Sequence, residues 1–302
     1  MQYRRLGKTG LRVSVVGVGT WQFGGEWGQA FDQAEVDRIL GRAAELGINL
    51  IDTAECYGDH LSEALVGEAL HRSGQRSRWI IATKFGHRFT GHLQREQLWS
   101  ASAVQQQLEG SLRALRTDVV DLYQFHSGGD DVFDNEELWA MLGKQVQAGK
   151  VRHLGISIGS AIDASYQAQR ASAVGASVLQ VVYNRLERRP EQQVFPHSLA
   201  QGLGILARVP LASGLLSGKY RPGDQFTAPD DVRASWSDER IQQQLREVEE
   251  IRQNEVPPDA PMAAWALAWC LRHPAVTAVI PGCKSVEQIE ANAVAASLAP
   301  AP

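Results

Sequence analysis

Short apolar runs alternate with longer segments of helical pattern along the 302 residues of this chain, and the alternation occurs eight times. The apolar runs are rich in Val, Ile and Leu, and they are continuous rather than interrupted at every second residue. Strands buried on both faces have this composition, as in a parallel sheet covered by helices. The eight predicted strands cover residues 13–20, 48–54, 78–84, 119–126, 151–157, 178–184, 204–211 and 277–282.

The segments between these runs carry the start and stop signals of helices. Residues that commonly cap a helix N-terminus are Asp32, Ser62, Asn135, Ser160 and Ser285. Glycines that close a helix are Gly47, Gly149, Gly175 and Gly202. The predicted helices cover residues 32–46, 62–72, 95–116, 135–148, 160–174, 190–202, 260–273 and 285–298. Eight βα units without a Pro- or Ser-rich linker predict an α/β fold, a single (β/α)8 (TIM) barrel domain over residues 1–302.

Two segments stand outside the alternation. Residues 3–14 read as a β-hairpin, because Gly7 and Gly10 flank Lys8-Thr9 as turn residues. Residues 212–259 hold a Gly-rich loop and a polar helix predicted at 237–253. An insertion after the seventh strand lies on the C-terminal face of a barrel, where barrel enzymes have their active sites.

Composition excludes several classes of function. The formal charge is −4, from 30 basic and 34 acidic residues, which argues against nucleic acid as the main partner. Three cysteines, far apart and without metal-binding spacing, predict a reduced, cytoplasmic protein. The N-terminus lacks an apolar signal core, and no run approaches the roughly 20 apolar residues of a membrane span.

Four reactive side chains fall at or just after the ends of three consecutive predicted strands: Asp52, Tyr57, Lys84 and His126. A tyrosine is a poor acid near its usual pKa of about 10, but a neighbouring ammonium lowers that pKa. Lys84 is placed to supply the ammonium, and Asp52 to hold it charged. His126 is placed to hydrogen-bond a substrate oxygen. The set suits delivery of a proton to a carbonyl oxygen.

Each of these residues also has an ordinary structural explanation. Asp52 can cap a loop, Tyr57 can cover the barrel mouth, and His126 can be a hydrogen-bonded core histidine. The joint placement at three strand ends favours a common site over these separate explanations. A metal-dependent hydrolase or aldolase needs more ligands than Asp52 and His126 provide, so no metal is predicted.

Two segments that contain glycine are candidates for binding a nucleotide. The segment GVGTWQFGG (17–25) fails the dinucleotide fingerprint, because Gln22 stands where the third glycine is required. The turn Gly282-Cys283-Lys284-Ser285 precedes a predicted helix and places free N–H groups and a lysine at its N-terminus. Such a turn can bind an anion, although an ordinary βα turn with a solvated Lys284 has the same sequence.

The chain resembles the aldo-keto reductases. The resemblance rests on the four residues above and on VVDLYQFH, VRHLGIS, LQVVYN, VPLASGLLSGKY and IPGCKSVEQIEAN, and it covers essentially the whole chain. DTAECYG and PGCKSVEQ place it nearest the bacterial and potassium-channel-β-subunit-like branch. The resemblance implies a barrel whose floor is capped by the hairpin and whose C-terminal mouth binds NADPH. It further implies Tyr57 as general acid, Lys84 and Asp52 as its tuning pair, and His126 as the group that orients the carbonyl.

The resemblance also implies cofactor-binding positions. Residues that match those holding the nicotinamide carboxamide are Ser157 and Gln180. Residues that match the backbone strap over the pyrophosphate are Pro210, Leu211, Ala212 and Gly214, with Lys219 nearby. Residues that match the adenosine 2′-phosphate and adenine region are Gly282, Lys284, Gln288 and Asn292. Three positions depart from the family pattern: Ile158 replaces a frequent Asn, Arg208 replaces an aromatic residue that stacks on nicotinamide, and Ala291 replaces a frequent Glu.

The predicted function is therefore NADPH-dependent, reversible reduction of an aldehyde or ketone, such as a sugar or aromatic carbonyl. The partners expected are small-molecule carbonyls and alcohols, without nucleic acid or membrane, for a monomer or weak homo-oligomer. Trp21 and Phe85 are predicted to line the substrate pocket. An alternative is an NADP(H)-binding redox-sensing or regulatory subunit with slow turnover.

Overall fold

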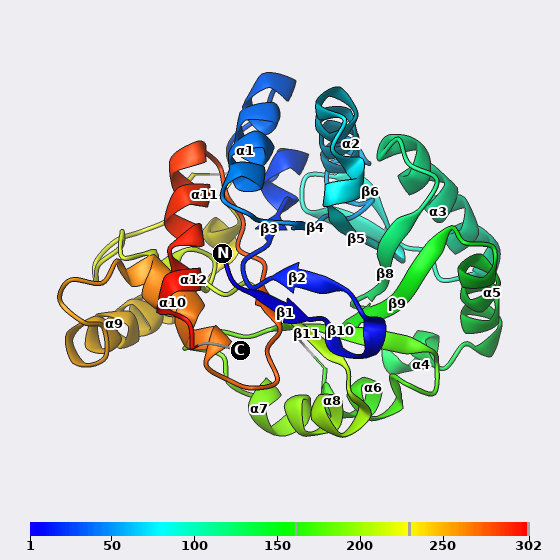
Figure 1. The fold of residues 1–302 in the computed structure, drawn as a ribbon. Helices are drawn as coiled ribbons and strands as arrows, with labels where there is room; N and C mark the ends of the chain where they lie inside the picture. The colour runs from blue at the N-terminus through cyan, green and yellow to red at the C-terminus, as the bar shows by residue number, and fades with distance from the viewer. Residues whose placement is uncertain (161, 229–230, 301–302) are drawn as a thin grey trace.

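Eight parallel strands form a sheet in the order β3-β4-β5-β8-β9-β10-β11-β12 in the computed structural model, which describes residues 1–160, 162–228 and 231–300. The strands are β3 (Val18–Gly19), β4 (Leu50–Asp52), β5 (Ile80–Phe85), β8 (Val120–His126), β9 (Val151–Ser157), β10 (Ala176–Val182), β11 (Gly204–Arg208) and β12 (Ala278–Val279). Parallel bridges Val16↔Val279 and Gly19↔Gly282 join the two edge strands. The sheet thus closes on itself, and helices surround it (Figure 1), which confirms the predicted (β/α)8 barrel.

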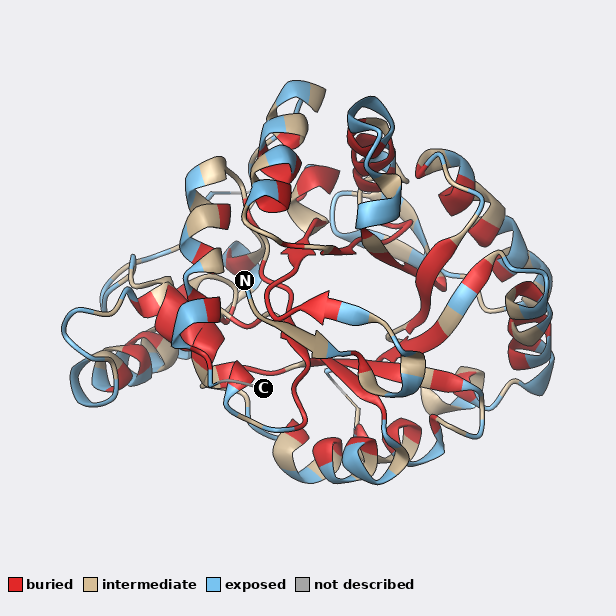
Figure 2. Cartoon of the chain, in the orientation of Figure 1, coloured by how far each residue is buried: buried red, intermediate tan, exposed pale blue. Residues whose placement is uncertain are grey.

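The helices pack their apolar faces on the sheet and expose their polar faces, as the burial colouring shows (Figure 2). The longer helices around the sheet are α1 (Gln33–Glu45), α2 (Leu61–Ser73), α3 (Ala101–Ala114), α5 (Glu136–Gln147), α6 (Ser165–Arg170), α8 (Phe195–Gln201), α10 (Met262–Leu271) and α11 (Val286–Ala293). Single-turn helices are α4 (Asp130–Phe133), α7 (Pro190–Gln193) and α12 (Ala295–Leu298). The side chains of Asp32, Asn135 and Ser285 accept backbone N–H bonds at the predicted helix starts, which confirms these three caps.

Two of the predicted helix caps are wrong. Helix α2 begins at Leu61, and the buried Ser62 lies inside it, where its hydroxyl donates to the Thr20 carbonyl at 2.9 Å. Ser62 therefore ties the helix to the loop after β3 instead of capping it. Helix α6 begins at Ser165 with Ala164 at its cap, five positions beyond Ser160. The predicted range 160–174 also includes residue 161, which lies outside the described residues.

A β-hairpin replaces the first residues of the helix predicted at 95–116. Strand β6 (His87–Gly91) pairs antiparallel with β7 (Gln94–Gln97), and helix α3 starts only at Ala101. The hairpin follows the C-terminal end of β5 and so reaches over the barrel mouth. Buried Glu26 fastens it there: one carboxylate oxygen accepts from the Leu93 N–H at 2.9 Å, and the other pairs with Arg95.

A second hairpin closes the opposite end of the barrel, as predicted. Strand β1 (Tyr3–Arg5) pairs with β2 (Arg12–Ser14), and the hairpin lies across the barrel floor (Figure 1). Leu6 is fully buried and belongs to one apolar cluster with Leu50, Leu122 and other inward-facing strand residues. Gly7 approaches β11 so closely that a Cβ would lie 2.1 Å from the Gly204 nitrogen, and its φ is +51°. Only glycine fits that contact.

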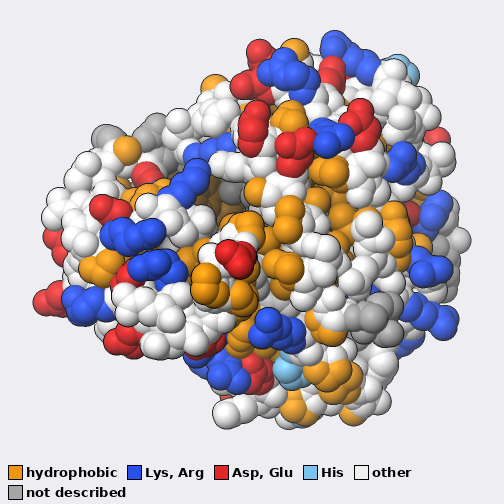
Figure 3. Space-filling view, turned by 60° about the vertical axis from the view of Figure 1, so that its left-hand side comes forward, with side chains coloured by type: hydrophobic (Ala, Val, Ile, Leu, Met, Phe, Trp, Pro, Cys, Tyr) orange, Lys and Arg blue, Asp and Glu red, His pale blue; other side chains and the backbone are white. Residues whose placement is uncertain are grey.

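The segment after β11 adds helix α9 (Asp238–Asn254), in agreement with the predicted polar helix. The helix lies outside the ring beside α10 (Figure 1), and its apolar face packs on Leu215 and Trp265. On the face drawn in Figure 3, basic and acidic side chains of the described residues are interspersed around apolar ones. Among the described residues, no helix is both long and apolar enough to cross a membrane.

A close approach of α2 to α3 predicts an unequal response to two glycine substitutions. A Cβ on Gly67 would meet the Ala114 carbonyl oxygen at 2.4 Å, whereas a Cβ on Gly41 in α1 meets nothing within 4 Å. Gly67→Ala should lower the free energy of unfolding by about 1–3 kcal/mol, because backbone atoms cannot move aside. Gly41→Ala should raise it by up to about 1 kcal/mol. Urea unfolding measures both, and equal effects would contradict the packing described.

Candidate active site

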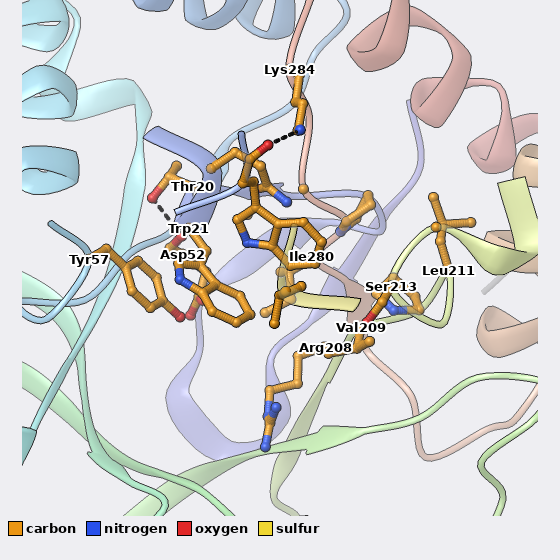
Figure 4. A pocket seen from close by; sticks show the side chains of 18 of the residues that line it. Thr20, Trp21, Asp52, Tyr57, Arg208, Val209, Leu211, Ser213, Ile280 and Lys284 are labelled. Carbon is orange, nitrogen blue, oxygen red and sulfur yellow. Dashed lines mark hydrogen bonds between the residues drawn. The ribbon is translucent and has the colours of Figure 1, made fainter. Parts of the chain in front are cut away.

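A cavity of about 850 Å³ opens at the C-terminal mouth of the barrel. Its wall is built from the ends of the strands, the loops after β3 and β4, the β6–β7 hairpin and the segment after β11. Asp52, Tyr57 and His126 all line it, so the structure brings three of the four predicted catalytic residues to one surface. Figure 4 shows Asp52 and Tyr57 there. The fourth, Lys84, lies directly behind them and is fully buried.

The Lys84 ammonium uses its three donors on three groups. It donates to Asp52 Oδ1 at 2.6 Å, to the Thr53 carbonyl at 2.7 Å and to the Tyr57 hydroxyl at 3.2 Å. The lysine comes from β5 and the aspartate from the end of the neighbouring β4, so parallel pairing places them together. Burial disfavours the ammonium, but Asp52 and Tyr57 together raise the pKa of Lys84 above its usual value. Lys84 is therefore charged at neutral pH.

Two glutamines complete the surroundings of Asp52. The Oδ2 atom accepts from Gln180 Nε2 at 2.7 Å and from Gln124 Nε2 at 3.1 Å. Gln124 belongs to β8 and Gln180 to β10. Ser157 lies behind Gln180, where its hydroxyl donates to Gln180 Oε1 at 3.4 Å. Strands far apart in sequence thus share one buried polar network around a single carboxylate.

Tyr57 lies in the loop between β4 and α2, and its ring stacks on Trp21 with centroids 5.9 Å apart (Figure 4). Gly58 in this loop packs against Gly24, where a Cβ would lie 2.5 Å from the Gly24 oxygen. Burial raises the pKa of the Tyr57 phenol to about 12, although the charge of Lys84 acts in the opposite direction. The net shift is opposite to the one expected from Lys84 alone. The phenol therefore carries its proton at neutral pH.

His126 ends β8 and faces Tyr57 edge-on, with ring centroids 6.2 Å apart. Burial, followed by repulsion from Lys84, lowers the pKa of His126 well below its usual value, so the imidazole is neutral. Its Nδ1 lies 3.8 Å from the Cys56 thiol. His87 Nε2 donates to the His126 carbonyl at 2.6 Å, which ties the β6–β7 hairpin to this strand end.

Glu55 belongs, like Tyr57, to the loop between β4 and α2 and is 3% exposed. Its Oε1 accepts from the His87 N–H at 3.0 Å, whereas Oε2 is buried and has no hydrogen-bonding partner among the described residues. Burial raises the pKa of Glu55 to about 8, and the nearby Glu63 adds to the shift. Neither Glu55 nor Cys56 was predicted as a site residue, because single residues within DTAECYG carry no distinguishing pattern.

Most of the predicted cofactor positions line the same cavity. These are Gln180, Arg208, Pro210, Leu211, Gly214, Lys219, Gly282, Lys284, Gln288 and Asn292. Ser157 lies behind Gln180 as described, and Ala212 is buried between the lining residues Leu211 and Ser213. Arg208 extends into the mouth (Figure 4) and donates to the Ile158 carbonyl at 3.1 Å, while its Nε is buried without a partner among the described residues.

The backbone after β11 has an unusual conformation at the cavity wall. Val209, Ala212 and Ser213 have φ values of 53°, 50° and 55°, a region in which residues other than glycine are uncommon. Each such residue costs on the order of 1–3 kcal/mol, and such residues cluster at ligand sites. Asn184 Nδ2 donates to the Val209 carbonyl at 3.0 Å and Arg233 to the Ser213 carbonyl at 3.2 Å, which stabilises the segment.

Arg233 was missed by the sequence analysis and lines the cavity beside this segment. Asp231 holds it through two hydrogen bonds, of 2.9 Å from Nε and 2.7 Å from Nη2, and its guanidinium lies 3.8 Å from the centroid of the Phe226 ring. The surrounding sequence, DDVRAS, shows no motif that marks this arginine. Only the path of the long loop brings it to the barrel mouth.

The turn before α11 forms the far end of the cavity. Ser285 caps the helix, and Lys284 donates through Nζ to the Trp27 carbonyl and through its backbone N–H to Gln288 Oε1, the latter at 2.8 Å. Among the lining residues around this turn, Gln22 Oε1, Trp27 Nε1 and Asn292 Nδ2 are buried polar atoms that have no partner among the described residues. This end therefore offers unused hydrogen-bonding groups next to a helix N-terminus.

The two predicted substrate-pocket residues lie in different environments. Trp21 lines the cavity, and its indole N–H donates to Glu26 Oε2 at 2.9 Å. Phe85 lies away from the cavity wall, fully buried, with its ring 4.7 Å from that of Tyr123 and 6.1 Å from that of Phe125. Its placement in the pocket was wrong, because the Phe85 side chain points from β5 into the aromatic layer between sheet and helices.

Comparisons with known proteins agree with this geometry. A profile described as "Aldo/keto reductase family" matches residues 15–300. The uncharacterized oxidoreductase YrpG of Bacillus subtilis is 33% identical over 301 residues, covering 96% of this chain and 89% of the relative. A protein of Oryza sativa subsp. japonica named a probable voltage-gated potassium channel subunit beta is 30% identical over 309 residues, covering 99% and 92%.

Solved structures show the same fold. Aldo-keto reductase AKR11C1 from Bacillus halodurans, in holo form, superposes with a TM-score of 0.82 at 32% identity, covering 100% of this chain and 92% of that one. The glycerol dehydrogenase AKR11B4 from Gluconobacter oxydans gives a TM-score of 0.83 at 28% identity, covering 97% and 89%. The barrel and the position of its mouth are therefore shared with enzymes of known structure.

The buried Lys84–Asp52 pair predicts a strong and coupled effect on stability. Asp52→Asn should lower the free energy of unfolding by about 3–5 kcal/mol, because it leaves the Lys84 ammonium buried without its counter-ion. Adding Lys84→Met should recover part of that loss, since the double variant buries no unpaired charge. Chemical unfolding of Asp52→Asn, Lys84→Met and the double variant tests the coupling. The exposed pair Arg88–Glu96 is the control, and Glu96→Gln should cost less than about 1 kcal/mol.

Proposed function

This chain belongs to the aldo/keto reductase family, and we propose that it is an NADPH-dependent carbonyl reductase acting through Tyr57 within a single domain of residues 1–302. Membership of the family implies an oxidoreductase that acts on carbonyl compounds with a nicotinamide cofactor. The observation that carries the finer proposal is the Lys84 ammonium, which bonds to Asp52 and Tyr57 at once while Tyr57 and His126 share the cavity wall.

The cavity suits an extended dinucleotide phosphate. Its far end combines Lys284 with the capped start of α11, and Lys219 and Arg233 line the same cavity. Three cations along one cavity favour a ligand with several phosphates. The unpartnered Asn292 Nδ2 and Trp27 Nε1 are donors available to such a ligand. Lys284 at the helix N-terminus is the reason to prefer NADPH, which carries an additional phosphate, over NADH.

In the proposed reaction, bound NADPH supplies the hydride. Tyr57 donates its phenolic proton to the carbonyl oxygen, and Lys84 stabilises the phenolate that remains. Asp52 keeps the Lys84 ammonium charged and directed towards Tyr57. Hydrogen bonds from Gln180 and Gln124 hold the Asp52 carboxylate in place. Neutral His126 can donate a hydrogen bond to the same substrate oxygen. Trp21 stacks on the Tyr57 ring and limits the movement of the acid.

Two of the predicted cofactor positions, Arg208 and Gln180, already make hydrogen bonds within the protein. Arg208 stands where an aromatic residue would stack on the nicotinamide, and its planar guanidinium can take that role while it donates to the Ile158 carbonyl. Gln180 donates to Asp52, so holding a carboxamide requires it to exchange a hydrogen bond. These two residues set the nicotinamide end of the proposed site.

Small polar carbonyls or alcohols are the substrates that we propose, since one structural relative is named a glycerol dehydrogenase. We keep the cytoplasm as the proposed location and a monomer or weak homo-oligomer as the proposed state. A redox-sensing subunit is the second candidate, favoured by the rice relative named a probable channel subunit beta. A stable complex with a partner protein and slow release of cofactor would distinguish this regulatory subunit from an enzyme with rapid turnover.

Removing the Tyr57 hydroxyl should abolish turnover but preserve cofactor binding. Tyr57→Phe keeps the ring that stacks on Trp21 and removes only the proton donor, so kcat with a small polar aldehyde such as glyceraldehyde should fall about 10²–10⁴-fold. NADPH affinity, followed by quenching of Trp21 and Trp27 fluorescence, should change less than about twofold. Unchanged kcat in this variant would exclude Tyr57 as the acid.

Charge at the far end of the cavity should discriminate between the two cofactors. Lys284→Met should raise the Kd for NADPH by about 10–100-fold, the effect of losing one charge-assisted contact, and should leave NADH binding nearly unchanged. Lys150→Met is the control, because Lys150 pairs with Glu109 beside the first residue of β9, away from the barrel mouth. An equal increase in the Kd for NADH would show that Lys284 does not bind the additional phosphate of NADPH.

A further inference from the structure

We propose that Glu55, Cys56 and His126 form a binding site for a soft divalent metal ion, with Zn²⁺ as the best fit, in the wall of the barrel-mouth cavity. A thiolate, an imidazole and a carboxylate are the ligand types found in protein zinc sites. Each residue offers one ligand atom, and the three atoms lie within 4.8 Å of one another.

The spacing of the sulfur and nitrogen atoms matches tetrahedral coordination. Zn–S and Zn–N bonds of about 2.3 and 2.0 Å, at a tetrahedral angle, place the two ligand atoms about 3.5 Å apart. Cys56 Sγ and His126 Nδ1 are 3.8 Å apart. Without a metal, this pair can form only a weak thiol–imidazole hydrogen bond. The Glu55 carboxylate, whose ligand atom lies within 4.8 Å of both, supplies the third ligand.

Glu55 supplies the independent reason to expect a cation. Its Oε2 is buried without a partner among the described residues, although a buried carboxylate oxygen normally has one. Oε1 already accepts from the His87 N–H, which holds the carboxylate in place. The buried Glu63 lies close enough to add to the negative potential. A divalent cation would satisfy Oε2 and offset both carboxylates.

Two cations near the site, Lys84 and Arg95, repel a metal ion. Arg95 is paired with Glu26 and Lys84 with Asp52, so each carries a compensating carboxylate. Burial, followed by the charge of Glu55, raises the pKa of Cys56, whereas Arg95 and Lys84 act in the opposite direction. The thiol therefore loses its proton only when it binds the metal. On binding, the S–H bond of Cys56 and the O–H bond of the Glu55 carboxyl break, S–Zn and O–Zn bonds form, and both protons pass to solvent.

The position of the site predicts its effect. Cys56 and His126 both line the cavity beside Tyr57, so a metal ion on them occupies the space next to the proposed acid. Zn²⁺ should therefore inhibit competitively with the carbonyl substrate. This inhibition rests on the proposed function, whereas the binding does not.

Cobalt(II) gives a readout of binding that does not depend on activity. Purified protein titrated with Co²⁺ should develop thiolate-to-cobalt charge-transfer absorption with one ion per chain, and Zn²⁺ should displace it. Cys56→Val should abolish the band, and Cys270→Ala, which removes another buried thiol, should retain it. Circular dichroism and thermal unfolding show whether each variant is folded. A wild-type protein without the band, or a folded Cys56→Val protein that retains it, would overturn the site.

Glu55→Gln tests the site without altering a thiol. It should weaken Co²⁺ binding at least about tenfold, as loss of a charged ligand does, while the band persists at higher metal concentration. Undiminished affinity would remove Glu55 from the ligand set. Zn²⁺ inhibition is measured against carbonyl concentration, relative to the metal-free rate of each protein. Cobalt absorption without inhibition would overturn the blocking role, and absence of any carbonyl reduction would overturn the proposed function alone.

Discussion

A lysine ammonium that is entirely removed from solvent organises the centre of this protein. Lys84 can stay charged there only because its three N–H donors all have acceptors and because Asp52 lies 2.6 Å away. An unpaired charge in such a place would cost several kcal/mol. Asp52 is itself held by amides from β8 and β10, so strands on separate parts of the barrel meet at one carboxylate. The buried charge of Lys84 therefore requires the hydrogen-bond network that surrounds Asp52.

The two ends of the barrel are built in different ways, and the difference matches their roles. The floor is closed by a hairpin whose Leu6 enters the apolar interior and whose Gly7 touches β11. The mouth carries the polar network, the residues with positive φ after β11 and several buried polar atoms that have no partner among the described residues. Buried polar atoms without such a partner also occur at the floor, at Gln2 Oε1 and Arg4 Nε, so the positive φ values after β11 are what set the mouth apart. Such backbone strain is expected where a ligand binds.

The alternation of apolar runs and helical segments was sufficient to predict the barrel, because strands buried on both faces and their caps leave local signals. The same kind of signal was ambiguous for Ser62 and Ser160, since a serine before a helix and a serine inside its first turn look alike in one dimension. The β6–β7 hairpin was missed because its short, polar strands resemble the start of a helix. That hairpin carries Arg95 to the mouth, so Arg95 was missed with it.

By itself, the sequence determined the eightfold βα order and the four reactive groups at consecutive strand ends, because both follow from local periodicity and from the rule that parallel strands end on one face. Only the tertiary structure decided how deeply those groups are buried and which charges surround them. Burial raises the pKa of Tyr57 even though Lys84 opposes it, and burial was not visible in the order of residues. It also decided that Phe85 packs inside, that Arg233 reaches the mouth, and that Glu55, Cys56 and His126 meet. These outcomes depend on the paths of long loops and on long-range packing, which no local pattern encodes.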